Sequence, residues 1–316
     1  AKLKNRTYDA LVPLSGGKDS TYVLYLATKK YNLRVLTYTY DNSFMSDIAK
    51  SNIESSINKC GVDHIWIKQN KDYIHNLYRT SLLKSGEICG ICGIGIERTM
   101  IKVSESYKVP LILVGHAPTE ENSFTNENIY DQNRIKAILR EDNIHSQKEV
   151  NQFLIYPNLN FISSFLFTKT GRFGKKVNVL YYIDLPSDKK IAEILKKEMD
   201  WAEPNTSEYT RHFDCIAEPF SNYIREKRFG YSRRISQLSN MIRNGEISRE
   251  EAIKIHQQDL KKAKPDNFSQ ITSLLSINEN DIRNIEQIPI GVYGDQQSIS
   301  NRIFAYTRKL VLKNDH

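Results

Sequence analysis

The sequence predicts an α/β protein with a parallel sheet in its first half and a mainly helical region behind it. Short apolar runs alternate with helical stretches from Tyr8 to Ala117, a pattern typical of a parallel sheet joined by crossover helices. From Asp200 on, the pattern is helical. A chain of 316 residues is long enough for one large or two ordinary domains with a full hydrophobic core.

The elements of the first half follow one another in regular alternation. Apolar runs bounded by turn residues predict strands at Tyr8–Leu14, Arg34–Tyr40, His64–Lys68 and Leu111–Gly115. Helices are expected between them at Ser20–Lys30, Phe44–Cys60, Lys71–Ser85 and Gly95–Tyr107. Ligands of such sheets bind at the carboxyl ends of the strands. The residues that follow each strand are therefore candidates for a functional site.

The second half begins with a polar stretch. Residues 119–156 show no regular spacing of apolar residues. We expect a loop insertion with short helices that covers the site. A fifth strand is expected at Val177–Ile183, and a helix with an N-cap serine follows at Ser187–Lys197. Further on, Ser248–Glu251 has the pattern of a capping box and predicts the start of another helix.

The composition is that of a globular protein with a basic surplus. Charged residues make up 26% and apolar residues 40% of the chain, and no apolar run approaches the roughly 20 residues of a membrane span. We expect a soluble, cytoplasmic protein without a membrane partner. The 45 Lys and Arg exceed the 37 Asp and Glu by a net charge of +8, which suits nucleotides, sugar nucleotides or RNA as partners. The sequence starts at Ala1 rather than Met, so an initiator residue or a longer leader can be missing from it.

A glycine turn stands where the first strand gives way to the first helix. Its sequence from Ser15 to Ser20 is Ser-Gly-Gly-Lys-Asp-Ser. A glycine turn at a helix N-terminus presents backbone N–H groups and the positive end of the helix dipole, and so forms a cradle for phosphate. It is not the Walker loop, because Ser15 directly precedes the Gly-Gly-Lys sequence. The alternative is an ordinary glycine-serine turn before a helix.

This motif resembles the PP-loop of the N-type ATP pyrophosphatases. The resemblance implies a Rossmann-like, adenine nucleotide alpha hydrolase-like ATP-binding domain over residues 1–185, followed by a mainly helical region over 186–316. In that superfamily the loop holds the pyrophosphate end of ATP while a substrate oxygen attacks the α-phosphate. The implied ATP-binding residues are Ser15, Gly16, Gly17, Lys18, Asp19 and Ser20. The glycines would let backbone N–H groups approach the phosphates, and the serine hydroxyls would donate hydrogen bonds to them. The lysine would neutralise phosphate charge.

Two further pairs stand at expected strand ends. Asp41 and Asn42 follow the second strand, where PP-loop enzymes commonly bind the nucleoside or ribose; the same pair is also an ordinary turn former. Gly115 and His116 follow the fourth strand and resemble the Gly-His pair that approaches the α-phosphate in several PP-loop enzymes. A structural histidine is the alternative.

The candidate catalytic residues are Lys18, Asp19 and His116. Glu120 and Glu121 are candidates for binding Mg²⁺ or acting as a general base, although two acids in a polar loop are usually just solvated.

The four cysteines do not suggest a disulfide framework. Cys89 and Cys92 form a CxxC half-site that aims two thiolates at one point, and Cys215 is a candidate third ligand. His212 is a candidate fourth ligand for zinc, and Cys60 is expected to be a small apolar residue at a helix end. The alternative is three unconnected structural thiols.

The order of PP-loop, CxxC, Gly-His and one distant cysteine is similar to that of the tRNA-thiolating PP-loop enzymes. In those enzymes three cysteines hold a [4Fe-4S] cluster with one iron left open to carry sulfur. The resemblance implies that Cys89, Cys92 and Cys215 are ligands of such a cluster, or of Zn²⁺.

The C-terminal third resembles a second family, the N-acetyl sugar amidotransferases of surface-polysaccharide (LPS) biosynthesis. The resemblance is carried by Tyr181–Ile183, Arg228–Arg234, Gln237–Ser239, Ile242–Glu246 and Ser248–Ala252. Those enzymes activate an acetamido oxygen with ATP and replace it with ammonia from a partner glutaminase. Those enzymes commonly begin with a cysteine-bearing leader, which is not part of the sequence given from Ala1 on.

Both resemblances imply the same first reaction, adenylylation of an amide or carbonyl oxygen by Mg²⁺-ATP with release of pyrophosphate. Our leading interpretation of the second step is amidation of an N-acetyl sugar nucleotide with ammonia supplied by a glutaminase. The alternative is cluster-dependent sulfur insertion into tRNA or a small molecule. A nucleotide-sensing module without turnover is a third, more distant interpretation.

Overall fold

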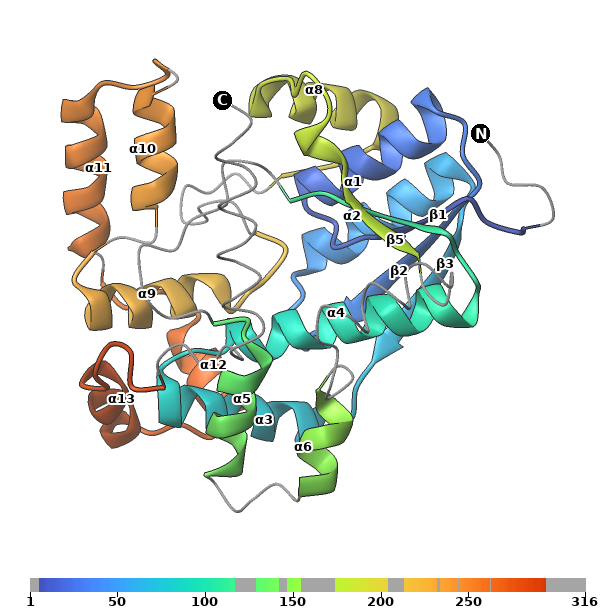
Figure 1. Cartoon of the computed structure of the whole chain (residues 1–316). Helices are drawn as coiled ribbons and strands as arrows, with labels where there is room; N and C mark the ends of the chain where they lie inside the picture. The colour runs from blue at the N-terminus through green and yellow to red at the C-terminus, as the bar shows by residue number, and fades with distance from the viewer. Residues whose placement is uncertain are drawn as a thin grey trace, which may run out of the picture.

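A five-stranded sheet forms the centre of the first half of the chain, and every neighbouring pair of its strands is parallel (Figure 1). The computed structural model describes residues 6–116, 129–141, 147–154, 174–203, 213–231, 234–243, 245–261 and 263–293. The strands are β1 (Ala10–Pro13), β2 (Val35–Asp41), β3 (Asp63–Lys68), β4 (Leu111–Val114) and β5 (Lys175–Asn178). Their order is β3-β2-β1-β4-β5. The predicted parallel α/β fold is confirmed.

The order of the strands marks one place on the sheet as a ligand crevice. From β1 the chain proceeds outward to β2 and β3, and then returns to the other side of β1 to form β4. The carboxyl ends of β1 and β4 therefore flank a topological switch point, where open α/β sheets bind their ligands. The loop from Ser15 to Gly17 leaves β1 at this point.

Helices cover both faces of the sheet (Figure 1). On one face lie α1 (Lys18–Tyr25, continued by the π-helical turn Leu26–Lys30), α2 (Asp47–Cys60) and α8 (Asp188–Met199). On the other lies α4 (Cys89–Ser106). Alternate residues of β1 face the two layers, because Val12 packs with the helices of the first face and Leu11 packs with Met100 and Val103 of α4. Burial on both faces explains why β1 and β4 are continuous apolar runs, whereas the edge strands β3 and β5 include exposed polar residues.

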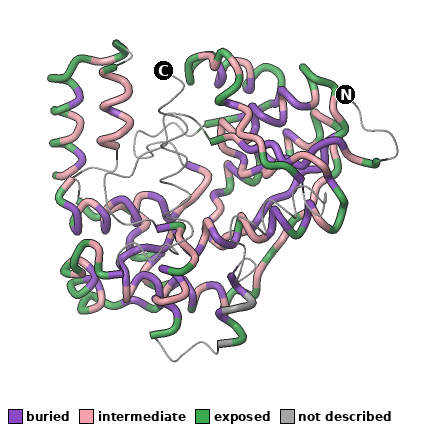
Figure 2. The backbone as a smooth tube through the Cα atoms, in the orientation of Figure 1, coloured by how far each residue is buried: buried purple, intermediate pink, exposed green. Residues whose placement is uncertain are grey.

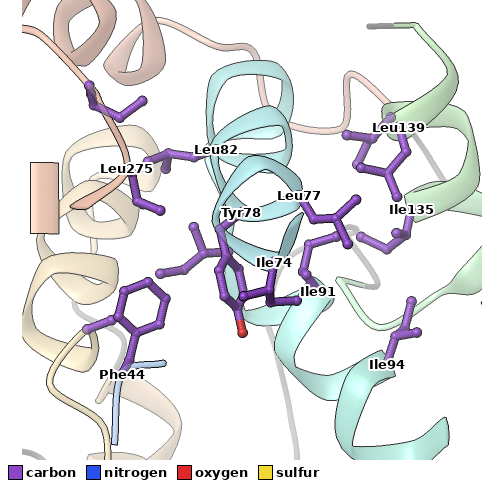
Figure 3. Close-up of a cluster of buried hydrophobic side chains, with 14 of the residues drawn as sticks. Phe44, Ile74, Leu77, Tyr78, Leu82, Ile91, Ile94, Ile135, Leu139 and Leu275 are labelled. Atoms are coloured by element: carbon purple, nitrogen blue, oxygen red, sulfur yellow. The ribbon is translucent and has the colours of Figure 1, made fainter. Parts of the chain in front are cut away.

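A second layer of helices has its own apolar core. Its members are α3 (Lys71–Ser85), α5 (Gln132–Arg140), α6 (Gln147–Phe153), α9 (Glu218–Phe229), α12 (Phe268–Leu274) and α13 (Glu279–Glu286). Figure 3 shows α3 at the centre, with Phe44 and Leu275 on one side of its side chains and Ile135 and Leu139 on the other. The core thus joins α3 to helices from the C-terminal region (Figure 2). The short helices expected within 119–156 are present as α5 and α6, and the rest of that stretch lies outside the described residues.

A buried ion pair fastens α9 to this core. Arg225 Nη1 donates to Glu87 Oε1 over 3.1 Å, and their side chains are only 9% and 2% exposed. Glu87 lies in the turn between α3 and α4, directly before the CxxC segment. Loss of either partner would leave an uncompensated buried charge. The ion pair therefore links α9 to the turn that precedes α4.

Two further helices of the described residues form a hairpin at the edge of the molecule (Figure 1). They are α10 (Ile235–Arg243) and α11 (Arg249–Leu260). The predicted capping box is confirmed, because Glu251 N donates to Ser248 Oγ and Ser248 N donates back to Glu251 Oε2. A bidentate pair between Arg234 and the buried Asp259 ties the two helices together. Among the described residues, no helix combines the length and apolar character that crossing a bilayer would require.

The fifth strand and the helix before β4 differ most from the expected boundaries. The fifth strand ends at Asn178 instead of Ile183, because its partner β4 ends at Val114, which is paired with Asn178. The chain continues as a 3₁₀ turn over Val179–Tyr181, the η3 segment, in which Tyr182 N donates to Val179 O. The helix expected at Gly95 begins six residues earlier, at Cys89, so that the CxxC motif forms its first turn.

Tertiary packing explains the early start of α4. Its first two turns contain three glycines, which disfavour a helix in isolation. Each glycine is contacted by a neighbour that leaves no room for a side chain: a Cβ atom at Gly90 would lie 2.2 Å from the carbonyl oxygen of Ile129, and one at Gly95 would lie 2.4 Å from Tyr40 Oη. Close approach of the backbone therefore requires glycine here, and packing supplies the stability that propensity does not.

Candidate functional site

The loop after β1 has the backbone geometry that its glycines predict. Gly16 has a φ of +79°, in the left-handed region that favours glycine. A Cβ atom at this position would also lie 2.3 Å from the carbonyl oxygen of Ala49, in the first turn of α2. Gly16 is therefore required both for the turn and for the contact with α2.

Two buried side chains fix the orientation of this loop. The carbonyl oxygen of Gly16 accepts hydrogen bonds from Asn52 Nδ2 and from Trp201 Nε1, each over 3.0 Å. Asn52 is itself held by Ala202, whose N–H donates to Asn52 Oδ1 and whose carbonyl accepts from Asn52 Nδ2, both over 2.8 Å. The carbonyl is thus turned into the protein, and the N–H of the same peptide group, that of Gly17, points the opposite way.

The two serine hydroxyls of the motif lie together inside the loop. Ser15 Oγ and Ser20 Oγ are 3.1 Å apart, and the backbone N–H groups of Gly17 and Ser15 donate to Ser15 Oγ and Ser20 Oγ respectively. Helix α1 starts at Lys18, and its first N–H groups have no partner within the helix. Hydroxyls and N–H groups therefore converge at the positive end of the α1 dipole, where an anion is stabilised.

Lys18 is paired with two carboxylates. Its Nζ lies 2.5 Å from Asp19 Oδ1 and 2.9 Å from Asp188 Oδ1, the latter from the first residue of α8. Burial acts to lower the pKa of Lys18, but the two carboxylates outweigh that effect and leave the pKa raised. The ammonium is therefore charged at neutral pH beside the loop. Asp188 was not predicted, because a residue 170 positions away gives no local signal.

Asp41 and Asn42 form the turn that follows β2. Ser43 N donates to Asp41 Oδ1 and Phe44 N donates to Asn42 Oδ1, over 3.0 and 2.9 Å, while Ser43 takes a φ of +67°. These bonds are those of Asx turns, so the turn-forming alternative describes both side chains. Asn42 also donates from Nδ2 to Cys92 Sγ over 3.4 Å, which links the end of β2 to the CxxC motif.

Gly115 lies against the start of α1, as its place at the switch point predicts. A Cβ atom on Gly115 would lie 2.8 Å from the carbonyl oxygen of Asp19, so β4 and α1 approach each other closely only because this residue is glycine. His116 follows and is exposed. The other candidates of this region, Glu120 and Glu121, lie outside the described residues.

A short segment from the C-terminal half crosses to this edge of the sheet. Met45 and Cys215 form an antiparallel bridge, in which Ser46 N donates to Asp214 O over 3.0 Å and Ile216 N donates to Phe44 O over 2.7 Å. We call residues 213–217 the strap. It brings Asp214 to the phosphate loop, because a Cβ atom at Gly17 would lie 3.3 Å from Asp214 Oδ2. Asp214 was not predicted, although it directly precedes a predicted cysteine.

The strap also brings Cys215 to the CxxC motif. All three predicted cysteines pack against the same apolar core, and a charge on Cys89 or Cys92 would be felt by Cys215. Burial is the main cause that raises the pKa of Cys92, to about 12, and that of Cys215 well above its ordinary value. Cys89 Sγ lies 3.4 Å from Ser221 Oγ of α9. In the described part of the chain, no three or more His, Cys, Asp or Glu side chains are arranged as a metal site.

The fourth cysteine is separate from these three. Cys60 ends α2, is half-buried among the apolar side chains between α2 and α8, and lies 3.3 Å from Thr28 Oγ1 and 3.7 Å from Met199 Sδ. The expectation of a buried small apolar residue is met in part, because Cys60 packs on apolar side chains but is only half-buried. His212, the candidate fourth zinc ligand, lies outside the described residues.

Two family models match separate parts of the chain. Residues 9–98 match the queuosine biosynthesis protein QueC, and residues 206–301 match the C-terminal domain of WbpG-like LPS biosynthesis proteins. The first match contains the phosphate loop and the CxxC motif, and the second contains the strap and α9 to α13. The resemblance to PP-loop proteins, with a C-terminal region like that of LPS biosynthesis proteins, is confirmed.

Single proteins match the chain over only part of its length or at low sequence identity. An uncharacterized protein of Methanocaldococcus jannaschii is 30% identical over 118 residues, which are 36% of this chain and 40% of that protein. Among solved structures, the U34-tRNA thiolase NcsA from Methanococcus maripaludis with its [4Fe-4S] cluster has a TM-score of 0.41 at 16% identity, over 83% of this chain and 76% of that one. Glutamine-dependent NAD+ synthetase from Acinetobacter baumannii, in complex with ADP, has a TM-score of 0.29 at 12% identity, over 68% of this chain and 46% of that one.

We predict that the Trp201→Phe variant is less stable than the native protein by about 2 kcal/mol, because it loses the hydrogen bond to Gly16 and some buried volume. The exposed Trp66 provides the matched control, and Trp66→Phe should cost less than about 0.5 kcal/mol. Urea unfolding followed by circular dichroism measures both. Equal losses in the two variants would mean that Trp201 does not hold the loop.

The raised pKa values predict slow thiol chemistry in metal-free protein. A thiol whose pKa is raised to about 12, as in Cys92, is almost wholly protonated at pH 8 and becomes reactive only as the pH approaches that value. Iodoacetamide should modify Cys92 and Cys215 at least about a hundredfold more slowly than free cysteine at pH 8. Mass spectrometry of the digested protein measures each site, with unfolded protein as control. Rapid modification of the folded protein would contradict the burial of these thiols.

Proposed function

We propose that this protein is an ATP-dependent enzyme that adenylylates an amide or carbonyl oxygen, releases pyrophosphate, and then replaces the activated oxygen. The observation that carries the proposal is the loop from Ser15 to Ser20, with its inward-turned Gly16 carbonyl and its hydroxyls at the start of α1. A phosphate chain on this loop would receive hydrogen bonds from backbone N–H groups and serine hydroxyls. The N–H groups of the first turn of α1 are held in position before the ligand arrives, whereas the serine hydroxyls would exchange their hydrogen bonds within the loop for bonds to phosphate.

Lys18 supplies the positive charge of this site. Its pairing with Asp19 and Asp188 keeps the ammonium protonated and holds it at the first turn of α1. A phosphate oxygen can take the place of one carboxylate, so that the lysine neutralises charge which develops on the leaving pyrophosphate. Mg²⁺ bound with ATP adds to this neutralisation.

The chemistry follows from the poor leaving ability of a carbonyl oxygen. The substrate oxygen attacks the α-phosphorus, the bond from that phosphorus to the pyrophosphate breaks, and the oxygen becomes part of an ester with AMP. A nucleophile then adds to the activated carbon, loses a proton, and displaces AMP with the original oxygen attached. His116, exposed at the end of β4, is our candidate for contact with the α-phosphate.

For the second step we propose amidation of an N-acetyl sugar nucleotide. The match of residues 206–301 to WbpG-like LPS biosynthesis proteins supports a sugar-nucleotide acceptor. Ammonia, supplied by a partner glutaminase, would add to the activated acetamido carbon and leave an acetamidine. The surplus of positive charge on the chain is in keeping with an anionic sugar nucleotide.

To test this function, the Lys18→Met variant is compared with Lys50→Met, in which an exposed lysine of the neighbouring helix is lost. With ATP, Mg²⁺, ammonium chloride and a UDP-N-acetyl sugar, Lys18→Met should form AMP at least about a hundredfold more slowly than the native protein. Lys50→Met should keep the native rate. Formation of AMP is measured by chromatography. Equal rates for native protein and Lys18→Met would contradict the proposed role of the loop.

A second candidate for the nucleophile is sulfur, supported by three thiols that pack on one apolar core, although in the described part of the chain they are not arranged as a metal site. The donor set of Cys89, Cys92 and Cys215 fits a [4Fe-4S] cluster better than a closed zinc site, which takes four ligands. Held by three thiolates, such a cluster would supply an iron with an open position for sulfur. The hydrogen bond from Asn42 to Cys92 would stabilise a thiolate ligand and fix its direction. The acceptor would then be tRNA or a small molecule.

Metal analysis separates the two nucleophiles. If sulfur is used, anaerobically purified protein should contain about four irons and four sulfides per chain, and Cys89→Ser, Cys92→Ser and Cys215→Ser should each lower that content. The Cys60→Ser variant is the matched control and should keep the full content, because Cys60 lies apart from the other three. Protein without iron, or with zinc alone, would leave ammonia as the nucleophile.

A further inference from the structure

The segment of residues 179–187 joins β5 to α8 and is anchored beside α1 at both of its ends. Before it, β5 ends level with β4, and Gly115, which follows β4, lies against the carbonyl oxygen of Asp19 in α1. After it, Asp188 places a carboxylate oxygen 2.9 Å from Lys18 Nζ. The segment therefore borders the carboxyl edge of the sheet next to the phosphate loop, where a ligand is expected.

The backbone of this segment is fixed at its start, and one of its aromatic side chains is left in solvent. In the η3 turn, Tyr182 N donates to Val179 O over 3.0 Å. Leu180 is 1% exposed and packs into the apolar core on the α1 and α8 side of the sheet. Tyr182, in contrast, is 80% exposed, more than any other large apolar side chain in the described part of the chain. A fixed turn thus holds an uncovered aromatic ring at this edge of the molecule.

Tyr182 is within reach of an acceptor that reacts beside the phosphate loop. It follows the end of β5 by four residues and precedes Asp188 by six. Because an extended chain spans at most about 3.6 Å per residue, its Cα lies within about 14 Å of the former and about 22 Å of the latter. A sugar nucleotide is suited to such a distance, since a pyranose, two phosphates and a ribose separate its acetamido group from its base. With its acetamido oxygen near Gly115, the acceptor could place its base at Tyr182.

The phosphate loop does not provide for the base of a second nucleotide. Its N–H groups, hydroxyls and lysine are donors suited to phosphate, and in the proposed reaction they hold ATP. A base is recognised differently, by stacking of its flat π-face on an aromatic side chain. Stacking would cover the ring of Tyr182 and the base together.

We propose that Tyr182 is a specificity-determining residue that stacks on the nucleobase of the sugar-nucleotide acceptor, an inference that rests on the function proposed above. ATP then lies on the loop from Ser15 to Ser20, and the acceptor lies along residues 179–187 with its acetamido oxygen toward the loop. Binding of the base adds affinity away from the reacting atoms and helps to orient the acetamido group. An acceptor without a base forgoes this contact.

The experiment compares two acceptors, a UDP-N-acetyl sugar and the corresponding N-acetyl sugar 1-phosphate, which carries the same acetamido group but no base. Formation of AMP with ATP, Mg²⁺ and ammonium chloride gives kcat/KM for each acceptor. Tyr182→Ala should lower kcat/KM for the UDP-sugar at least about tenfold, because the stacked ring is gone. The value for the sugar 1-phosphate and the KM for ATP should stay at their native levels.

Two further variants separate stacking from a general defect. Tyr182→Phe keeps the ring and should retain the native preference for the UDP-sugar. The matched control is Tyr31→Ala, because Tyr31 is 53% exposed and follows the opposite end of the helix that begins with α1. This control should keep the native values for both acceptors.

The inference is overturned if Tyr182→Ala forms AMP with the native kcat/KM for the UDP-sugar, a result that leaves the proposed function intact. It is also overturned if the variant loses activity equally with both acceptors, which would indicate a structural role or a contact with the sugar. A native protein that forms no AMP with either acceptor would contradict the proposed function itself, and this inference with it.

Discussion

The backbone bridge between the strap and residues 44–46 is the interaction on which the rest of the site depends. Two hydrogen bonds, from Ser46 N to Asp214 O and from Ile216 N to Phe44 O, join the turn after β2 to a segment about 170 residues later. Asp214 in this bridge reaches Gly17 of the phosphate loop, and Cys215 in the same bridge packs on the apolar core that also contacts Cys89 and Cys92. Phe44 packs on Tyr78 of α3, with ring centroids 5.0 Å apart, so the bridge is anchored in the helical core.

The parallel sheet accounts for the other half of the arrangement. Strands that all run in one direction deliver their following residues to a single edge, and the crossover helices begin at that edge. The strand order therefore brings the phosphate loop, Asn42, Gly115 and the first turn of α4 to the same edge of the sheet. The strap, which is not part of the sheet, adds the thiol of Cys215 and places the carboxylate of Asp214 beside Gly17 of the loop.

Local signals predicted the sheet, the phosphate loop and the CxxC motif, because apolar periodicity and a glycine turn are properties of neighbouring residues. The start of α4 could not be predicted, because its glycines are stabilised by contacts with Ile129 and Tyr40 that only the folded chain makes. The same holds for the bonds from Asn52 and Trp201 to Gly16, since the two donors are remote from the loop in sequence. Cys215 was predicted as a third ligand because the CxxC motif is only a half-site, and the family resemblance supported that choice, although no local pattern linked Cys215 to Cys92.

The central claim is that ATP activates an oxygen of the acceptor, and oxygen tracing tests it most directly. The acceptor is prepared with ¹⁸O in its amide carbonyl and is turned over with ATP, Mg²⁺ and the nucleophile. Because the bond between carbon and oxygen breaks when AMP departs, mass spectrometry should find the ¹⁸O in AMP and none in pyrophosphate. Unlabelled AMP, or formation of ADP and phosphate in its place, would contradict adenylylation of the acceptor.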